Sequence, residues 1–158
     1  MKLTLLTVGK TDVKWVKEGL DLYGDRLRHY VPYALVELPE LKGVAALTRE
    51  QIKEREGKAL LAALKPSDEV WLLDEHGKEF RSLEFAAFLE ERLSRGGGRD
   101  LVFVVGGAYG FSEEVYARAA GKLSLSRMTF SHQMVRTIFA EQLYRAFTIL
   151  RNEPYHHE

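Results

Sequence analysis

Short hydrophobic runs typical of strands alternate along the chain with segments whose hydrophobic residues recur every three or four positions. The strand-like runs are residues 2–9, 33–40, 69–75, 101–107 and 122–126. The helical segments are residues 12–28, about 48–64, a segment that opens at 82, about 112–120 and about 132–150. Strands separated by helices are typical of a parallel sheet covered by helices on both faces. The sequence therefore predicts one α/β domain over residues 1–158.

Several local signals predict where these elements begin and end. Thr48, Ser82 and Ser112 each precede a helical pattern and are expected at helix starts, because their hydroxyls can accept a free backbone N–H. His76-Gly77 is expected to turn the chain after the third strand. Pro154 cannot continue the last helix.

Composition limits where the protein works and what it binds. Cysteine is absent, which makes a reducing cytoplasm the expected compartment. No hydrophobic run approaches the roughly 20 residues of a membrane span, and the opening MKLTLLTVGK is too short and polar for a secretion signal. The 23 basic and 23 acidic side chains balance, so RNA binding would need a local basic patch rather than overall charge.

The stretch LVFVVGGAYGFSEE, residues 101–114, carries a glycine turn between a buried strand and a helix. Gly106 and Gly107 allow a ligand to approach the backbone closely. The spacing differs from the G-x-G-x-x-G of dinucleotide-binding folds, and no Gly-Lys-Ser/Thr phosphate loop occurs. By itself this stretch leaves two alternatives open: a ligand cradle, or a tight turn that binds nothing.

Together with this stretch, three further segments carry a resemblance to a known family: MKLTLLTVGK, LSLSRMTFSHQMVR and EQLYRAFTILRNEPYHHE. In these segments the chain resembles the RlmH family of SPOUT-class methyltransferases. The resemblance implies a C-terminal trefoil knot, S-adenosylmethionine as cofactor, and a homodimer. It also implies methyl transfer to N3 of pseudouridine 1915 of 23S rRNA, on assembled ribosomes. The knot and the cofactor site would lie within about residues 101–158.

The resemblance also implies where the methyl donor binds. The expected contacts are Leu73, Gly106, Gly107, Leu125, Ser126, Arg127, Met128, Thr129 and Phe130. Leu73, Gly106 and Leu125 lie near carboxyl ends of predicted strands, where open α/β sheets bind ligands. Leu73, Leu125 and Met128 could cover the faces of an adenine. No basic side chain occurs in residues 101–110, which suits a positively charged sulfonium.

Methyl transfer to an imide nitrogen requires that its proton be removed and that the resulting anion be stabilised. Candidates for this chemistry and for RNA contact lie near the C-terminus: His132, Arg136, Arg145, Tyr155, His156 and Glu158. Arg136 is expected to bind phosphate and Glu158 to contact RNA, while His132 fits helix-start packing or RNA contact equally. For Tyr155 and His156, base stacking with proton transfer is favoured over a merely docked chain end. The pair His156-His157 lacks a third ligand, so no metal site is expected.

The last helix predicts an interface. Its apolar residues cover most of the circumference: Met134, Val135, Ile138, Phe139, Leu143, Ala146, Phe147, Ile149 and Leu150. Such a helix is buried from more than one side, as in a dimer. Arg145 falls inside this arc beside Glu141. Two interpretations stay open: a structural Glu141–Arg145 pair, or an Arg145 that reaches the partner's cofactor site.

Two other functions remain possible at this point. The first is methylation of a different RNA uridine, for example in tRNA, because a fold does not fix a substrate. The second is a non-catalytic ribosome-binding protein. Ser131, where proline is common in the family, frees the backbone before His132 and could cap the last helix.

Overall fold

A computed structural model of the chain describes residues 1–95 and 97–157, and its centre is one sheet. The strands are β1 (Leu3–Val8), β2 (Tyr33–Leu38), β3 (Glu69–Glu79), β4 (Leu101–Val105) and β5 (Gly121–Ser124). Their order is β2-β1-β4-β3-β5, and every neighbouring pair is parallel. All strands therefore end at the same edge of the sheet.

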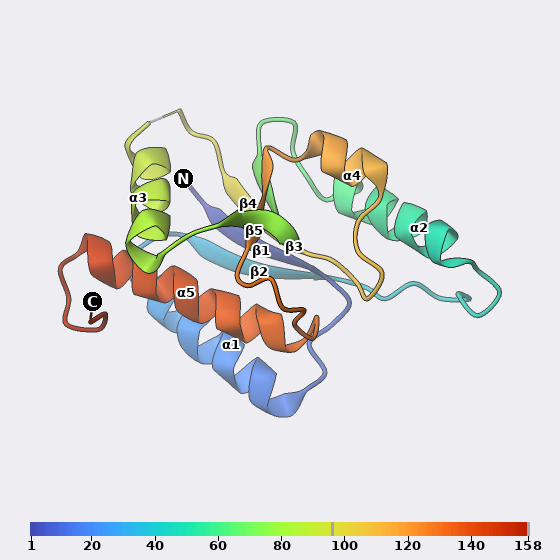
Figure 1. The fold of residues 1–158 in the computed structure, drawn as a ribbon, viewed down its shortest axis with the longest axis horizontal. Coiled ribbons are helices and arrows are strands. Elements are labelled where there is room, and N and C mark those ends of the chain that lie inside the picture. The colour runs from blue at the N-terminus through green and yellow to red at the C-terminus, as the bar shows by residue number, and fades with distance from the viewer. Residues whose placement is uncertain (96, 158) are drawn as a thin grey trace.

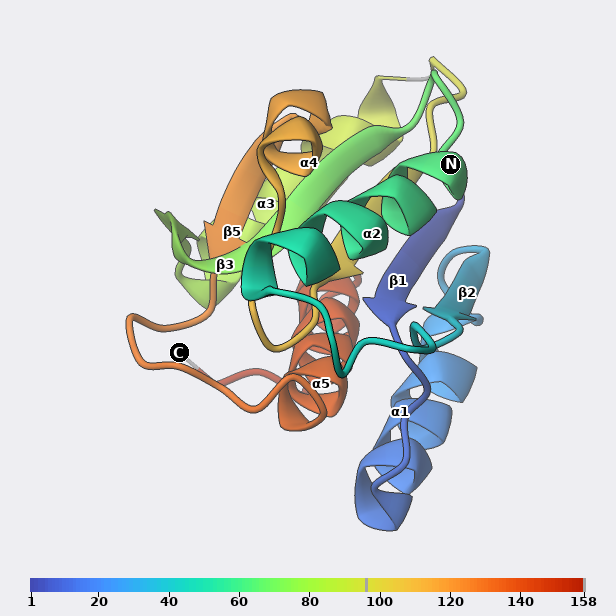
Figure 2. The same cartoon turned by 90° about the vertical axis from the view of Figure 1, so that its right-hand side faces the viewer.

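Helices cover both faces of this sheet, as the sequence predicted. Those on one face are α1 (Lys14–Leu27), α3 (Ser82–Ser94) and α5 (Met134–Leu150), and those on the other are α2 (Arg49–Ala62) and α4 (Glu113–Arg118) (Figures 1 and 2). No helix in residues 1–95 and 97–157 is both long and apolar enough to cross a membrane.

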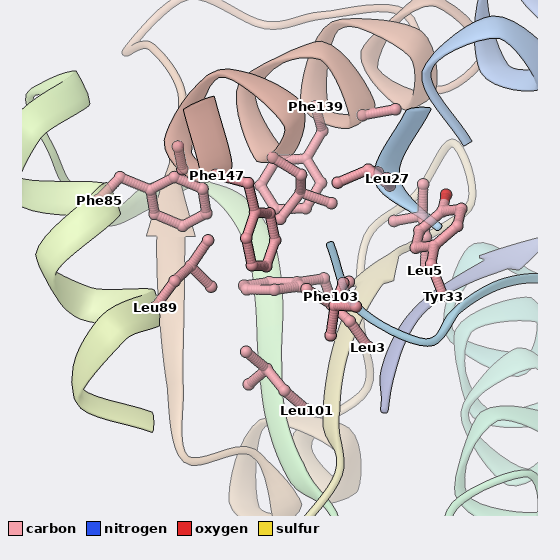
Figure 3. Packing of buried hydrophobic residues seen from close by; sticks show 14 of the residues in the cluster. Leu3, Leu5, Leu27, Tyr33, Phe85, Leu89, Leu101, Phe103, Phe139 and Phe147 are labelled. Carbon is pink, nitrogen blue, oxygen red and sulfur yellow. The ribbon is translucent and has the colours of Figure 1, made fainter. Parts of the chain in front are cut away.

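The larger hydrophobic core fills the space between the sheet and α1, α3 and α5 (Figure 3). Phe103 of β4 lies at its centre, with its ring centroid 4.8 Å from that of Phe139 in α5. All five residues of β4 are buried, because helices cover this strand on both sides. β4 is consequently a rigid platform for the loop that follows it.

Two helix starts agree with the sequence signals, and one does not. At the start of α2, the Thr48 hydroxyl accepts the amide of Gln51, and the Gln51 side chain accepts the amide of Thr48. At the start of α4, the Ser112 hydroxyl accepts the amide of Val115. Ser82 does not cap α3. It is the first helical residue, and the amide of Arg81 before it donates to Glu84 instead.

The third strand is longer than predicted. The expected turn at His76-Gly77 is wrong: β3 continues to Glu79, and its register against β5 shifts between Leu73 and Lys78. A Cβ added at Gly77 would lie 2.6 Å from the backbone nitrogen of Leu123 in β5. The glycine therefore serves close approach of two strands rather than a turn.

The other strands at the site end earlier than predicted. β4 stops at Val105 and β5 at Ser124, so Gly106 and Leu125 each follow a strand and lie in loops. α5 begins at Met134 rather than 132. The peptide groups of both loops are thereby released from the sheet ladder and can face a ligand.

Candidate functional site

A pocket of about 270 Å³ opens where β3 passes the ends of β4 and β5. Its walls include all the predicted cofactor residues except Arg127: Leu73, Gly106, Gly107, Leu125, Ser126, Met128, Thr129 and Phe130. His132 and Val135 add a wall from the start of α5. Arg127 points away, with 88% of its side chain exposed, and lies 3.9 Å from Glu79. Residues from the middle of β3, from the loops after β4 and β5 and from the start of α5 thus meet in one cavity.

The glycines of the turn after β4 leave room for neighbouring side chains as well as for a ligand. A Cβ at Gly106 would lie 2.9 Å from the ring of Phe111, which also lines the pocket. A Cβ at Gly107 would lie 2.6 Å from a carboxylate oxygen of Glu56 in α2. Gly110 has a φ of +85°, which L side chains rarely adopt. A Cβ at Gly106 would therefore displace the Phe111 ring, one at Gly107 would displace the end of the Glu56 side chain, and Gly110 adopts a conformation that favours glycine.

Serine side chains shape the loop between β5 and α5. Ser124 Oγ donates to the carbonyl of Ser126, and Ser126 Oγ accepts the amide of Met128, at 2.8 and 3.0 Å. Ser131 Oγ accepts the amides of Gln133 and Met134, so it satisfies free N–H groups at the helix start as the sequence suggested. The loop is held by its own side chains, while Met128 is 77% exposed at the pocket rim.

Acidic residues that were not predicted lie in the pocket wall directly after Leu73. Asp74 accepts hydrogen bonds from the hydroxyl of Tyr116 and the amide of His76. Partial burial opposes ionisation of Asp74, but these hydrogen bonds outweigh it and lower the pKa of the carboxyl. Burial and the bond to Asp74 raise the pKa of Tyr116 to about 12. The sequence offered one signal, the position of Asp74 and Glu75 at a strand end.

Arg136 is not exposed, as a contact with an RNA phosphate would require. Its side chain is fully buried, and its guanidinium donates to the carbonyls of Val8, Gly9 and His132 at 2.9, 2.9 and 3.0 Å. The same group binds Thr11 Oγ1 and lies 3.5 Å from a carboxylate oxygen of Glu37. Burial lowers the pKa of Arg136, and nearby carboxylates oppose this shift. The expectation that Arg136 grips RNA is therefore corrected: its donors tie α5 to the end of β1.

A second polar cluster lies near the C-terminal end of α5. Arg145 Nη2 binds Glu141 Oε1 at 2.7 Å, and Arg145 Nη1 lies 3.0 Å from His156 Nδ1. The Tyr155 hydroxyl donates to the same Glu141 oxygen at 3.0 Å, and its ring packs edge-on against Tyr144. The Glu141–Arg145 pair, one of the two interpretations left open by the sequence, is thus present, and the chain end docks on it.

Burial raises the pKa of the Tyr155 hydroxyl, and hydrogen bonding to Tyr23 and Glu141 raises it further. Tyr155 is therefore protonated near neutral pH. In that state it can donate a hydrogen bond to an anion but cannot remove a proton.

The cluster formed by Glu141, Arg145, Tyr155 and His156 does not line the pocket of its own chain. Val135 in the pocket wall and Arg145 are ten residues apart on one helix, which is about 15 Å along its axis. The chain end lies at the opposite end of α5 from the loop that precedes the helix (Figure 1). Glu158 lies outside the described residues. Within residues 1–95 and 97–157, no three His, Asp or Glu side chains gather as metal ligands.

Comparisons with known proteins agree with this arrangement. A family model described as "Predicted SPOUT methyltransferase" matches residues 1–156. A protein of Parabacteroides distasonis is 54% identical over 158 residues, and one of Phocaeicola vulgatus is 53% identical over 158, each match covering both chains completely. A protein of Christiangramia forsetii is 52% identical over 157 residues, or 99% of each chain. All three relatives are named Ribosomal RNA large subunit methyltransferase H.

Replacing Arg136 with methionine should lower the free energy of unfolding by about 3–5 kcal/mol, because buried carbonyls and Glu37 lose their donor. Urea denaturation measures this change. Arg127→Met is the matched control, since its side chain is exposed, and should change stability by less than about 0.5 kcal/mol. Equal stability of the two variants would contradict a structural role for Arg136.

Proposed function

The chain belongs to the SPOUT methyltransferases, in the family of ribosomal RNA large subunit methyltransferase H, and we propose that it methylates N3 of a pseudouridine in 23S rRNA with S-adenosylmethionine as donor. One observation carries the proposal. The residues expected to contact the donor come from separate parts of the chain, and all but Arg127 line one pocket. The resemblance to the RlmH family is confirmed by the relatives.

The pocket fits the chemistry of this donor. Apolar side chains of Leu73, Leu125 and Met128 can cover the faces of an adenine, and the loops after β4 and β5 offer free peptide groups. The lining carries carboxylates but no lysine or arginine, which suits a cationic ligand. When bound, S-adenosylmethionine supplies a methyl group on a positively charged sulfur, ready for an in-line nucleophile. The role of this chain is then mainly to hold both reactants in line.

The second cluster fits the other requirement of the reaction, an anion on the target base. Arg145 is oriented by Glu141 and His156, so its guanidinium is fixed rather than free to swing. A fixed guanidinium stabilises negative charge on an imide that has lost its proton. We expect the ring of Tyr155, whose hydroxyl donates to Glu141, to stack against the same base, and we propose His156, which contacts Arg145, for proton transfer.

We propose that the two clusters meet in a homodimer. Within one chain Arg145 lies about 15 Å along α5 from the pocket wall. If two α5 helices pack antiparallel, Arg145 of each protomer approaches the pocket of the other. Trp15 and Leu22 on α1 and Met134 on α5 are exposed by 56%, 47% and 41%, as expected of a surface that a second copy covers. The C-terminal region would form the trefoil knot that the family implies.

We propose the assembled ribosome, in the cytoplasm, as the place of action. The relatives are named for the large-subunit RNA, and a buried Arg136 leaves the pocket mouth without that basic side chain for phosphate. Recognition of a base already presented by folded RNA demands less binding surface than capture of a free strand. His132 and the chain end are the groups we expect to contact RNA.

Gly106→Val should abolish binding of S-adenosylmethionine, because the new side chain forces the Phe111 ring into the pocket. Isothermal titration calorimetry should show at least roughly a hundredfold loss of affinity, since a displaced ring blocks the site. Gly97→Val is the matched control, because a Cβ there meets nothing within 4 Å. Circular dichroism confirms that both variants fold. Unchanged affinity in Gly106→Val would remove this pocket as the donor site.

Incubation with assembled ribosomes and donor should add one methyl group to a pseudouridine of 23S rRNA. Mass spectrometry of nuclease digests measures it. Free large subunits and bulk tRNA are the parallel substrates, and both should gain far less. Methylation of tRNA alone would favour the other uridine substrate, and donor binding without any methylation would favour a non-catalytic ribosome-binding protein.

Truncation after Pro154 should leave donor affinity unchanged and reduce methylation to background, because Tyr155 and His156 lie outside the pocket of their own chain. Mixing the truncated variant with Gly106→Val after joint refolding tests the dimer. Random pairing leaves one complete site in half of the dimers, so about a quarter of wild-type activity should return. No recovery in mixed dimers would show that each pocket uses its own chain end.

A further inference from the structure

The donor pocket is acidic. Counting histidine as neutral, Asp74 and Glu75 carry the only charges among the described residues that line it. Both follow Leu73, where β3 passes the ends of β4 and β5. The lining has no lysine or arginine, so the field inside the pocket favours a cation.

Hydrogen bonds hold both carboxylates in place. Asp74 accepts from Tyr116 of α4 and from the His76 amide, and Glu75 accepts from the Thr129 hydroxyl in the loop after β5. The bonds from Tyr116 and Thr129 join β3 to α4 and to the loop after β5. The low pKa of Asp74 shows that the charged form is the stable one. These charges are therefore fixed features of the wall.

Nearby cations compensate this charge only in part. Lys122 favours ionised Asp74, but it is not in the lining, and its ammonium lies 5.5 Å from the centroid of the Tyr116 ring. Arg127 Nε lies 3.9 Å from a carboxylate oxygen of Glu79, and both side chains are exposed. His76 Nε2 is 3.5 Å from Glu75. The wall thus holds two carboxylates, and Lys122 acts on Asp74 from outside the lining.

We propose that Asp74 and Glu75 make the pocket selective for the positively charged methyl donor over its neutral product. This inference rests on the proposed function. Methyl transfer forms an N–C bond and breaks a C–S bond, whose electron pair stays on sulfur, while the imide proton leaves to a base. The sulfur compound thereby loses one positive charge. The same wall that binds the donor then binds the product less tightly, which promotes product release.

Calorimetric titration of the full-length protein with three ligands tests the proposal. S-adenosylmethionine and sinefungin both carry a positive charge at the sulfur position, whereas S-adenosylhomocysteine is neutral there. The wild type should bind both cationic ligands more tightly than the neutral one. Asp74→Asn and Glu75→Gln should each lower this preference by roughly threefold to tenfold, and more at low salt than at high salt.

Matched variants isolate the effect of charge. Asp74→Glu keeps the charge and should keep the preference, while Glu54→Gln removes an exposed carboxylate of α2 and should leave the preference unchanged. Thermal denaturation checks that all variants fold. An unchanged preference in Asp74→Asn and Glu75→Gln would overturn this inference alone. A wild type that binds none of the three ligands would overturn the proposed function, and this inference with it.

Discussion

The buried guanidinium of Arg136 connects the end of the first strand, β1, to the start of the last helix, α5. It donates to carbonyls at the end of β1 and to His132 at the start of α5, and it lies near Glu37 of β2. The loop between β5 and α5 forms one wall of the pocket, and Arg136 fixes the point where that loop ends. A buried charge is costly unless its donors are satisfied. Each nitrogen of the Arg136 guanidinium donates to a backbone carbonyl, which offsets the cost of burying the charge. These bonds form only when α5 starts at this position against β1, so they also fix the pocket wall.

The glycine turn after β4 meets two demands at once. Phe111 and Glu56 occupy the space that side chains at Gly106 and Gly107 would need. The backbone of the same residues faces the pocket. Packing behind the turn therefore enforces a bare backbone in front of it. A side chain at Gly106 would displace the Phe111 ring, which itself lines the pocket, so the glycine also preserves the shape of the site.

Much of the fold could be predicted from the sequence, because alternation of strand and helix patterns determines a parallel sheet. The residues of the pocket were implied by the family resemblance. In the sheet Gly106 and Leu125 follow β4 and β5, and Leu73 lies in β3 between these two strands. Two features could not be predicted locally. Gly77 resembles a turn residue, and only its contact with β5 shows otherwise. Arg136 resembles a surface cation, because two of its carbonyl acceptors, Val8 and Gly9, are more than 120 positions away in the chain.

The separation of the two charged clusters fits the charges of the reaction. In the proposed reaction the acidic pocket wall faces a cationic donor, whereas Arg145 faces the anion of the target base. If both stood in one cavity they would pair with each other and lose their effect on the reactants. About 15 Å of helix keeps them apart within a chain, and Glu141 and Asp74 each have other partners. In the proposed dimer, the acidic pocket wall of one chain and Arg145 of the other would face each other with the donor and the target base between them. The wall would then stabilise the donor, and Arg145 the anion of the base.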